Sequence, residues 1–254
     1  MSAEDQIQQA GSAQWQVISL RLTAFPVSTL EVPANGWWAS LAGEEPEIRQ
    51  HKPKTHELQE IGTYKLGRLI VAANPARFDL QLHPLPISQE GFGSPPTLGS
   101  LVESLAVFMP VAAHWLQEND ADLQRMAFGA EVFLPADNEE EALRQLSPFI
   151  PLTIDPDTTS DLLYQINRRR HSKVVPDLLV NRLSKWAVVK FSFGAQIDAQ
   201  SFDLPGLEQF VTYLELDINT SPKFWGVLSH NMLDMAFKEL VEMGQEITEK
   251  GDTP

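Results

Sequence analysis

The amino-acid sequence predicts an α+β fold: a mostly antiparallel sheet of about seven strands, packed by two long amphipathic helices. Short stretches in which apolar and polar residues alternate recur along the chain, and this is the period of half-buried strands. Two longer segments, near 101–116 and 225–247, carry apolar residues at helical spacing instead. The strands come in runs between these helices, an order that favours antiparallel pairing over a doubly wound α/β fold.

The chain has 254 residues, of which 43% are hydrophobic, as is typical of a globular protein. We expect a disordered N-terminal arm over residues 1–14, because this segment is polar and poor in aromatic residues. A single α+β domain over 15–250 should follow. Its halves, 15–118 and 123–250, would each end in a long helix, so they could share one topology, although no residue-level repeat relates them.

In the first half, strands are predicted at 18–24, 64–73 and 78–82. The segment 27–62 contains several prolines and no clear period, which indicates a long irregular connection. The turn residues at 73–76 predict a hairpin between the second and third strands. Ser100 and Glu103 have the spacing of a capping box, so we expect the first long helix to begin there.

In the second half, strands are predicted at 126–134, 162–166, 186–193 and 214–218. Asp137 and Glu140 are spaced as a capping box for a short acidic helix. Ser221 and Pro222 are favourable residues for the N-cap and first position of the last helix. The apolar stripe of that helix would then run from Trp225 to Ile247.

Several classes of protein are excluded by composition. The chain has no cysteine, which excludes disulfides, thiolate catalysis and cysteine-ligated metal sites, and fits a reducing compartment. No stretch approaches the roughly 18 consecutive apolar residues of a membrane-spanning helix. The first residues show neither the basic nor the apolar region of a secretory signal, so we expect a cytoplasmic protein that does not enter membranes.

Charge is distributed unevenly along the chain. Its net charge is −15, which opposes binding to nucleic acid or to an anionic membrane, and favours a basic partner or simply solubility. Residues 160–190 nevertheless hold seven basic and two acidic residues, a local charge of +5, which leaves −20 for the remainder. Such asymmetry is typical of an interaction surface.

The sharpest local feature is a run of arginines after the strand at 162–166, which we expect at a hairpin tip or sheet edge. Together with a tryptophan pair in the 27–62 connection, it supplies the predicted partner-binding residues: Arg168, Arg169, Arg170, His171, Lys173, Trp37 and Trp38. Guanidinium groups suit carboxylates and phosphates, so any contact with nucleic acid would be local to Arg168–Lys173. The alternatives are that the arginines pair with acids of the same chain, and that the tryptophans anchor their loop to the core.

No catalytic motif is present, and we predict no catalytic residue, metal site or cofactor. Glu215 and Asp217 share one face of the last predicted strand, where paired carboxylates could hold a metal ion or act as acid and base. They could equally face solvent or pair with cations of a neighbouring strand. His51 and His56 lie five residues apart but lack the spacing of a zinc-binding helix.

These observations favour a non-catalytic protein-interaction module or an accessory subunit of a larger assembly. One alternative is an inhibitor or immunity-type protein whose acidic surface neutralises a basic enzyme. Another is a metal-dependent hydrolase that uses Glu215 and Asp217. The sequence does not identify the partner or the oligomeric state.

Overall fold

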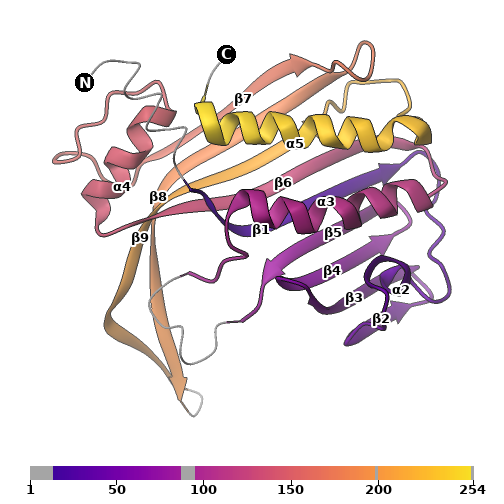
Figure 1. Ribbon diagram of the computed structural model, residues 1–254, viewed down its shortest axis with the longest axis horizontal. Helices are drawn as coiled ribbons and strands as arrows, with labels where there is room; N and C mark the ends of the chain where they lie inside the picture. Colours follow the sequence, from indigo (N-terminus) through magenta and orange to yellow (C-terminus); the bar gives the residue numbers. More distant parts are fainter. Residues whose placement is uncertain (1–13, 87–94, 198–199, 253–254) are drawn as a thin grey trace.

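The computed structural model describes residues 14–86, 95–197 and 200–252. They form one nine-stranded antiparallel sheet with the long helices on one of its faces (Figure 1). The predicted α+β class is therefore confirmed, although the predicted count of seven strands was too low. Residues 1–13 of the predicted arm lie outside the described part of the chain. No helix within that part is long and apolar enough to span a membrane.

The sheet has the strand order β2-β3-β4-β5-β1-β6-β9-β8-β7. The strands are β1 (Gln16–Pro26), β2 (Ile48–Lys52), β3 (Glu57–Tyr64), β4 (Gly67–Asn74), β5 (Arg77–Pro84), β6 (Leu123–Ala136), β7 (Leu163–His171), β8 (Leu179–Ile197) and β9 (Gln200–Thr220). The α-helices of the described residues are α2 (Trp38–Ala42), α3 (Leu101–Glu118), α4 (Glu139–Leu146) and α5 (Leu233–Lys250). The hairpin of β8 and β9 extends beyond the rest of the sheet (Figure 1).

Two runs of elements follow the same order around the central pair of β1 and β6. On one side β1 is followed outward by β5, β4 and β3, and on the other side β6 is followed by β9, β8 and β7. Each run has a short helix after its first strand and a long helix, α3 or α5, after its last strand. The first run carries the additional edge strand β2, so the other edge of the sheet is β7.

The hydrophobic core lies between the sheet and the two long helices, which run side by side across it (Figure 1). Trp115 of α3 stacks on Phe78 of β5 with ring centroids 3.6 Å apart. Phe237 of α5 meets Phe128 of β6 edge to face. The predicted capping box of α3 is present, because Ser100 and Glu103 each bond the other's backbone N–H. These contacts fix the face of the sheet that the helices cover.

The opposite face of the sheet is called the open face here. Residues such as Arg21, Glu131, Glu215 and Arg169 point to it, because they alternate with residues that point toward the helices. A polar face of this kind is usual where an antiparallel sheet is packed on one side only.

The 27–62 segment contains regular structure that the sequence pattern did not predict: α2, β2 and the start of β3. All five residues of β2 are exposed, so this edge strand shows no apolar alternation. In β3 the core-facing position 60 is a glutamate that is completely buried. Its carboxylate accepts hydrogen bonds from the backbone N–H groups of Trp37 (2.9 Å) and Trp38 (3.0 Å). A charged side chain at a core position conceals the strand pattern.

The last helix was predicted to begin too early. It begins at Leu233, and the preceding segment from Pro222 to Ser229 is not helical. The reason is a tertiary contact: Leu228 and Leu123 exchange two backbone hydrogen bonds, of 2.8 and 3.1 Å, as an isolated β-bridge. Leu228 is fully buried there, so a residue that matches the helical stripe in sequence belongs to an extended segment instead.

The cap of the short helix α4 also differs by one position from the prediction. Its N-cap is Asn138, whose side chain accepts from the backbone N–H of Glu141. The predicted pair Asp137 and Glu140 lies one residue earlier. The backbone N–H of Asp137 instead donates to the carboxylate of Glu141. Asparagine caps as well as aspartate does, so both registers were compatible with the sequence.

Candidate interaction surface

Trp225 is the one tryptophan that the fold leaves in solvent. It is 99% exposed, whereas each of the other five tryptophans is at most 8% exposed. The buried five are Trp15, Trp37, Trp38, Trp115 and Trp186. Because water is an unfavourable environment for an indole ring, a wholly exposed tryptophan is a candidate for contact with a partner.

The loop that carries Trp225 is held at both ends by the sheet. At its start the backbone N–H of Ser221 donates to the carbonyl of Leu179 at 2.8 Å. Leu179 is the first residue of β8 and pairs with His171, the last residue of β7. At its end Leu228 pairs with Leu123. Trp225 therefore projects from a loop whose ends are fixed, so the binding of a partner would cost little ordering of the loop.

The neighbours of Trp225 explain why it points outward. The ring of Phe224 lies over Gly226, where an added Cβ would come within 2.4 Å of the ring, and Phe224 packs partly on the core. A side chain at position 226 would require the phenyl ring to move. With Phe224 turned inward, the next side chain in the extended loop, that of Trp225, is directed to solvent.

Further apolar side chains are exposed at the same end of the sheet. Val227 is 44% exposed and Val27, just after β1, is 54% exposed. Val27 lies at this end because its N–H donates to the carbonyl of Asp122, the residue before Leu123. Nearby, Phe25 lies between two guanidinium groups, those of Arg77 (5.7 Å) and Arg125 (5.3 Å). We call this set the Trp225 surface: Phe25, Val27, Arg125, Lys223, Trp225 and Val227.

The Trp225 surface contains two basic side chains, Arg125 and Lys223, and the exposed Asp122 lies at the same end of the sheet. Arg77 is paired with Asp79 at 2.5 Å. Arg125 and Lys223 form no ion pair with any described residue, and the Nε of Arg125 reaches only the carbonyl of Thr220, at 3.4 Å. In a chain of net charge −15, this end therefore combines exposed apolar groups with cations.

The predicted partner-binding arginines are separated by strand geometry. They lie within β7, whose residues point alternately to the two faces of the sheet. Arg168 bonds Asp252 through Nε (2.5 Å) and Nη2 (3.0 Å), and Arg170 pairs with Glu246 of α5 at 2.5 Å. Arg169 is exposed on the open face. The alternative of pairing within the chain thus accounts for two of the three arginines.

The remaining predicted residues also divide. His171 and Lys173 are exposed, and the backbone N–H of Lys173 donates to Glu239 of α5. Trp37 and Trp38 are buried, and the Trp37 ring meets Phe78 and Trp115 in the core. The two tryptophans therefore anchor their loop, which was the alternative to partner contact. The helical stripe in the sequence predicts Trp225 in the core instead, and this prediction is wrong.

Glu215 and Asp217 both point to the open face, but each already has a partner. The Glu215 carboxylate pairs with Lys185 of the neighbouring strand at 3.0 Å, and Asp217 accepts from Asn219. Burial, reinforced by Glu131 and Glu215, raises the pKa of the Tyr213 phenol nearby. Glu215 and His83 both line a cavity of about 90 Å³ on the open face, and burial lowers the pKa of the His83 imidazole. Among described residues, no group of three or more histidines, aspartates and glutamates could hold a metal ion.

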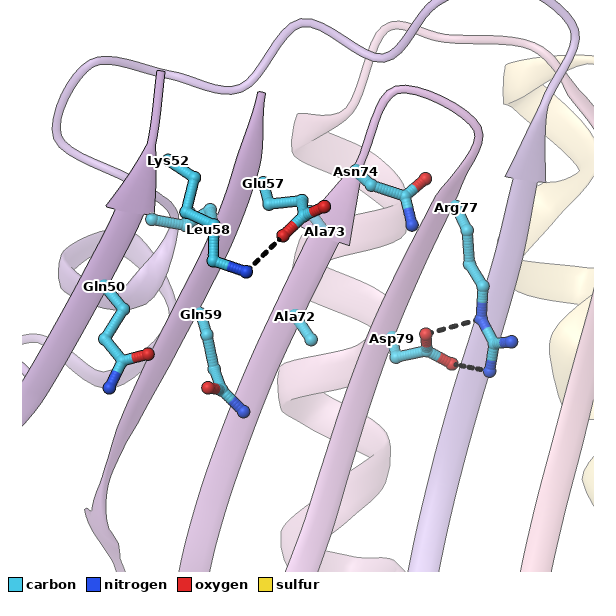
Figure 2. A pocket seen from close by; sticks show the side chains of 10 residues that line it. All are labelled: Gln50, Lys52, Glu57, Leu58, Gln59, Ala72, Ala73, Asn74, Arg77 and Asp79. Carbon is cyan, nitrogen blue, oxygen red and sulfur yellow. Dashed lines mark hydrogen bonds and ion pairs between the residues drawn. The ribbon is translucent and has the colours of Figure 1, made fainter. Parts of the chain in front are cut away.

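A second hollow on the open face lies between β2 and β5 and has a volume of about 260 Å³. Its charged side chains are paired with each other, as Figure 2 shows: Lys52 with Glu57 at 2.7 Å, and Arg77 with Asp79 at 2.5 Å. The other side chains that line it are the amides of Gln50, Gln59 and Asn74 and the apolar Leu58, Ala72 and Ala73. It presents no unpaired charge to a ligand, so it is a weaker candidate than the Trp225 surface.

No protein-family model matches the chain, and no curated protein matches it.

Proposed function

We propose that this chain is a protein-interaction module that binds a protein partner through the Trp225 surface. The observation that supports it most is the 99% exposure of Trp225, the single tryptophan that the fold does not bury. Tryptophan is among the residue types that most often dominate the energy of protein–protein interfaces. Its indole buries about 150–250 Å² when a partner encloses it.

A protein is a better partner for this surface than a membrane. The chain carries a net charge of −15, which repels anionic lipid, so electrostatics would oppose insertion of the loop into such a membrane. A protein that offers an apolar pocket for Trp225 and carboxylates for Arg125 and Lys223 avoids this repulsion. The partnered state of Glu215 and Asp217 also favours an interaction role over the alternative of a hydrolase.

The proposal is tested by comparing two variants of the full chain in the native host. Trp225→Ala removes the exposed indole, and Val102→Ser is the matched control, because Val102 is 73% exposed on α3, away from the Trp225 surface. We expect a partner that co-purifies with the natural chain and with Val102→Ser but is lost with Trp225→Ala. With purified partner, Trp225→Ala should weaken Kd about 30-fold, which corresponds to a loss of about 2 kcal/mol.

Three results would contradict the proposal. One is a set of partners that both variants retain equally, and the other is a Kd that Trp225→Ala leaves unchanged. Binding to anionic lipid vesicles that depends on Trp225, in the absence of any protein partner, would also overturn it.

A further inference from the structure

The outer edge of β7 presents backbone groups that no described residue bonds. β7 is the last strand of the sheet and pairs with β8 alone. In an antiparallel pair, alternate residues direct both N–H and C=O to the neighbour, and the residues between them direct both groups away. Which residues of β7 belong to each set follows from the bonds at its two ends.

At each end, the residue that directly flanks β7 is even-numbered and bonds to β8 or to the residue just before β8. The N–H of Val188 donates to the carbonyl of Leu162 at 3.3 Å, and the N–H of Ser172 donates to the carbonyl of Leu178 at 2.8 Å. Both pairs continue the register of β7 and β8. The even residues of β7 therefore face β8. The residues whose backbone groups point away from the sheet are Leu163, Gln165, Asn167, Arg169 and His171.

Among the described residues, none covers this edge along the length of β7. The five residues with outward backbone groups are all exposed, and Leu163 is 61% exposed although it is apolar. The strand has nine residues, or about 30 Å at 3.4 Å per residue. At the other edge of the sheet, β2 has five residues. Natural sheets seldom leave an edge as long as β7 without cover, because it is a template for another strand.

Charge decides which kind of strand fits. Arg168, Arg169 and Arg170 follow one another along the edge, and Lys173 comes just after it. Arg169 forms no ion pair with any described residue, and the Arg168 and Arg170 side chains remain 34% and 30% exposed despite their pairs with Asp252 and Glu246. A second β7 strand, paired antiparallel over its full length, would set Arg169 opposite Gln165 and would bring it no carboxylate, because β7 contains no acidic residue. An acidic strand would meet the opposite charge.

We propose that an extended, acidic segment of a partner protein adds a tenth strand to the edge of β7. Backbone hydrogen bonds to the outward groups would provide affinity, and carboxylates near Arg169 and Lys173 would provide specificity. The proposal is independent of the Trp225 surface, since it follows from strand pairing and charge alone. The end of β7 and the start of the loop that carries Trp225 lie at the same end of the sheet, because Leu179 pairs with His171 and accepts the N–H of Ser221.

The probe for this edge is a nine-residue peptide in which glutamate and valine alternate, compared with the same peptide in which lysine replaces glutamate. Backbone amides of the full chain are followed by NMR with hydrogen exchange. We expect the glutamate peptide to slow exchange at the outward amides of residues 163, 165, 167, 169 and 171, and the lysine peptide to have no effect. The binding should weaken as NaCl is raised.

Two pairs of variants separate the backbone from the charge. Gln165→Pro removes one outward N–H without touching the ladder to β8, a place where edge strands tolerate proline. Gln165→Thr keeps the N–H. We expect about a five- to tenfold loss of affinity for Gln165→Pro alone, the value of one peptide hydrogen bond. Arg169→Glu should weaken binding at least as much, whereas Lys54→Glu, an equal charge change on the exposed turn beside β2, should not.

The folding of each variant is checked by circular dichroism. If Gln165→Pro does not fold, Arg169→Glu and the hydrogen-exchange data still test the proposal. The proposal is overturned if the peptide protects no outward β7 amide, if it protects the edge at β2 instead, or if the lysine peptide binds equally well. It is also overturned if Arg169→Glu and Lys54→Glu bind the glutamate peptide with the same affinity.

Discussion

Replacing Trp225 by alanine should leave the stability of the fold almost unchanged. A fully buried tryptophan removes about 150–250 Å² from water, which contributes about 4–6 kcal/mol at roughly 25 cal/mol per Å². Because Trp225 remains 99% exposed, it gains almost none of this. We therefore expect the free energy of unfolding to change by less than about 0.5 kcal/mol, as for other surface substitutions.

Trp115→Ala is the matched comparison, since it removes the same side chain from a buried site. Trp115 is 1% exposed and stacks on Phe78 at 3.6 Å. Its removal should cost about 3–5 kcal/mol, the usual range for a large aromatic residue in a core. Urea denaturation followed by far-ultraviolet circular dichroism measures both values, and avoids the fluorescence that the substitutions alter.

Fluorescence then reports on Trp225 directly. With Trp225 present, acrylamide should quench a solvent-exposed component of the emission. In Trp225→Ala that component should disappear, and the emission maximum should move to shorter wavelength. The reasoning is refuted if Trp225→Ala costs more than about 2 kcal/mol, or if acrylamide quenching is the same with and without Trp225.

Three further predictions concern α5 and its contacts with β7. Leu240→Ala should lower the free energy of unfolding by about 2–5 kcal/mol, because Leu240 is 1% exposed in the core; an unchanged urea midpoint would contradict this. Arg168→Ala should lower the free energy of unfolding by about 1–3 kcal/mol, because it leaves Asp252 without its charged donor. Arg169→Ala should change it by no more than about 0.5 kcal/mol. Equal losses of stability in the two variants would contradict this difference. Burial opposes ionisation of Asp252, but the hydrogen bonds from Arg168 and Tyr164 outweigh it and hold the pKa of this carboxyl below its ordinary 3.8. Because the folded-state pKa is depressed, the pairing stabilises the fold above about pH 4 and is lost as pH falls toward the lowered pKa, so Asp252→Asn should flatten the acid limb of a stability–pH curve.

Local signals in the sequence were sufficient where the structure they specify is local. The capping box at Ser100 and Glu103 and the turn at Asn74 and Pro75 depend on neighbours within a few residues, and both are present. The alternation of apolar residues likewise placed the central strands, because these strands are buried on the face that the helices cover.

Tertiary contacts explain the differences. Ser221 and Pro222 would suit a helix start, and Leu228 continues the apolar stripe, but the bridge of Leu228 to Leu123 holds this segment extended. The arginine run was placed after a strand that in fact includes it. Since the acids that pair with Arg168 and Arg170 come from the C-terminal helix region, about 80 residues later, no local pattern could show which arginines remain exposed.

The Trp225 surface could not be predicted for the same reason. In sequence, Trp225 fits a helical core stripe as well as Leu240 does, and only the position of α5 separates an exposed loop from a buried helix. An aromatic residue three positions after a proline and just before a glycine is a weak loop signal. That signal was outweighed by the apolar period that follows it.

The most direct test of an interaction role is site-specific photocrosslinking in the native host. A photoreactive phenylalanine analogue is placed at position 225, and in a separate chain at position 102, which is exposed on α3. The account predicts that position 225 crosslinks to a defined protein and that position 102 does not. No protein crosslink from position 225, or the same crosslinks from both positions, would contradict the claim that the exposed tryptophan is a docking site.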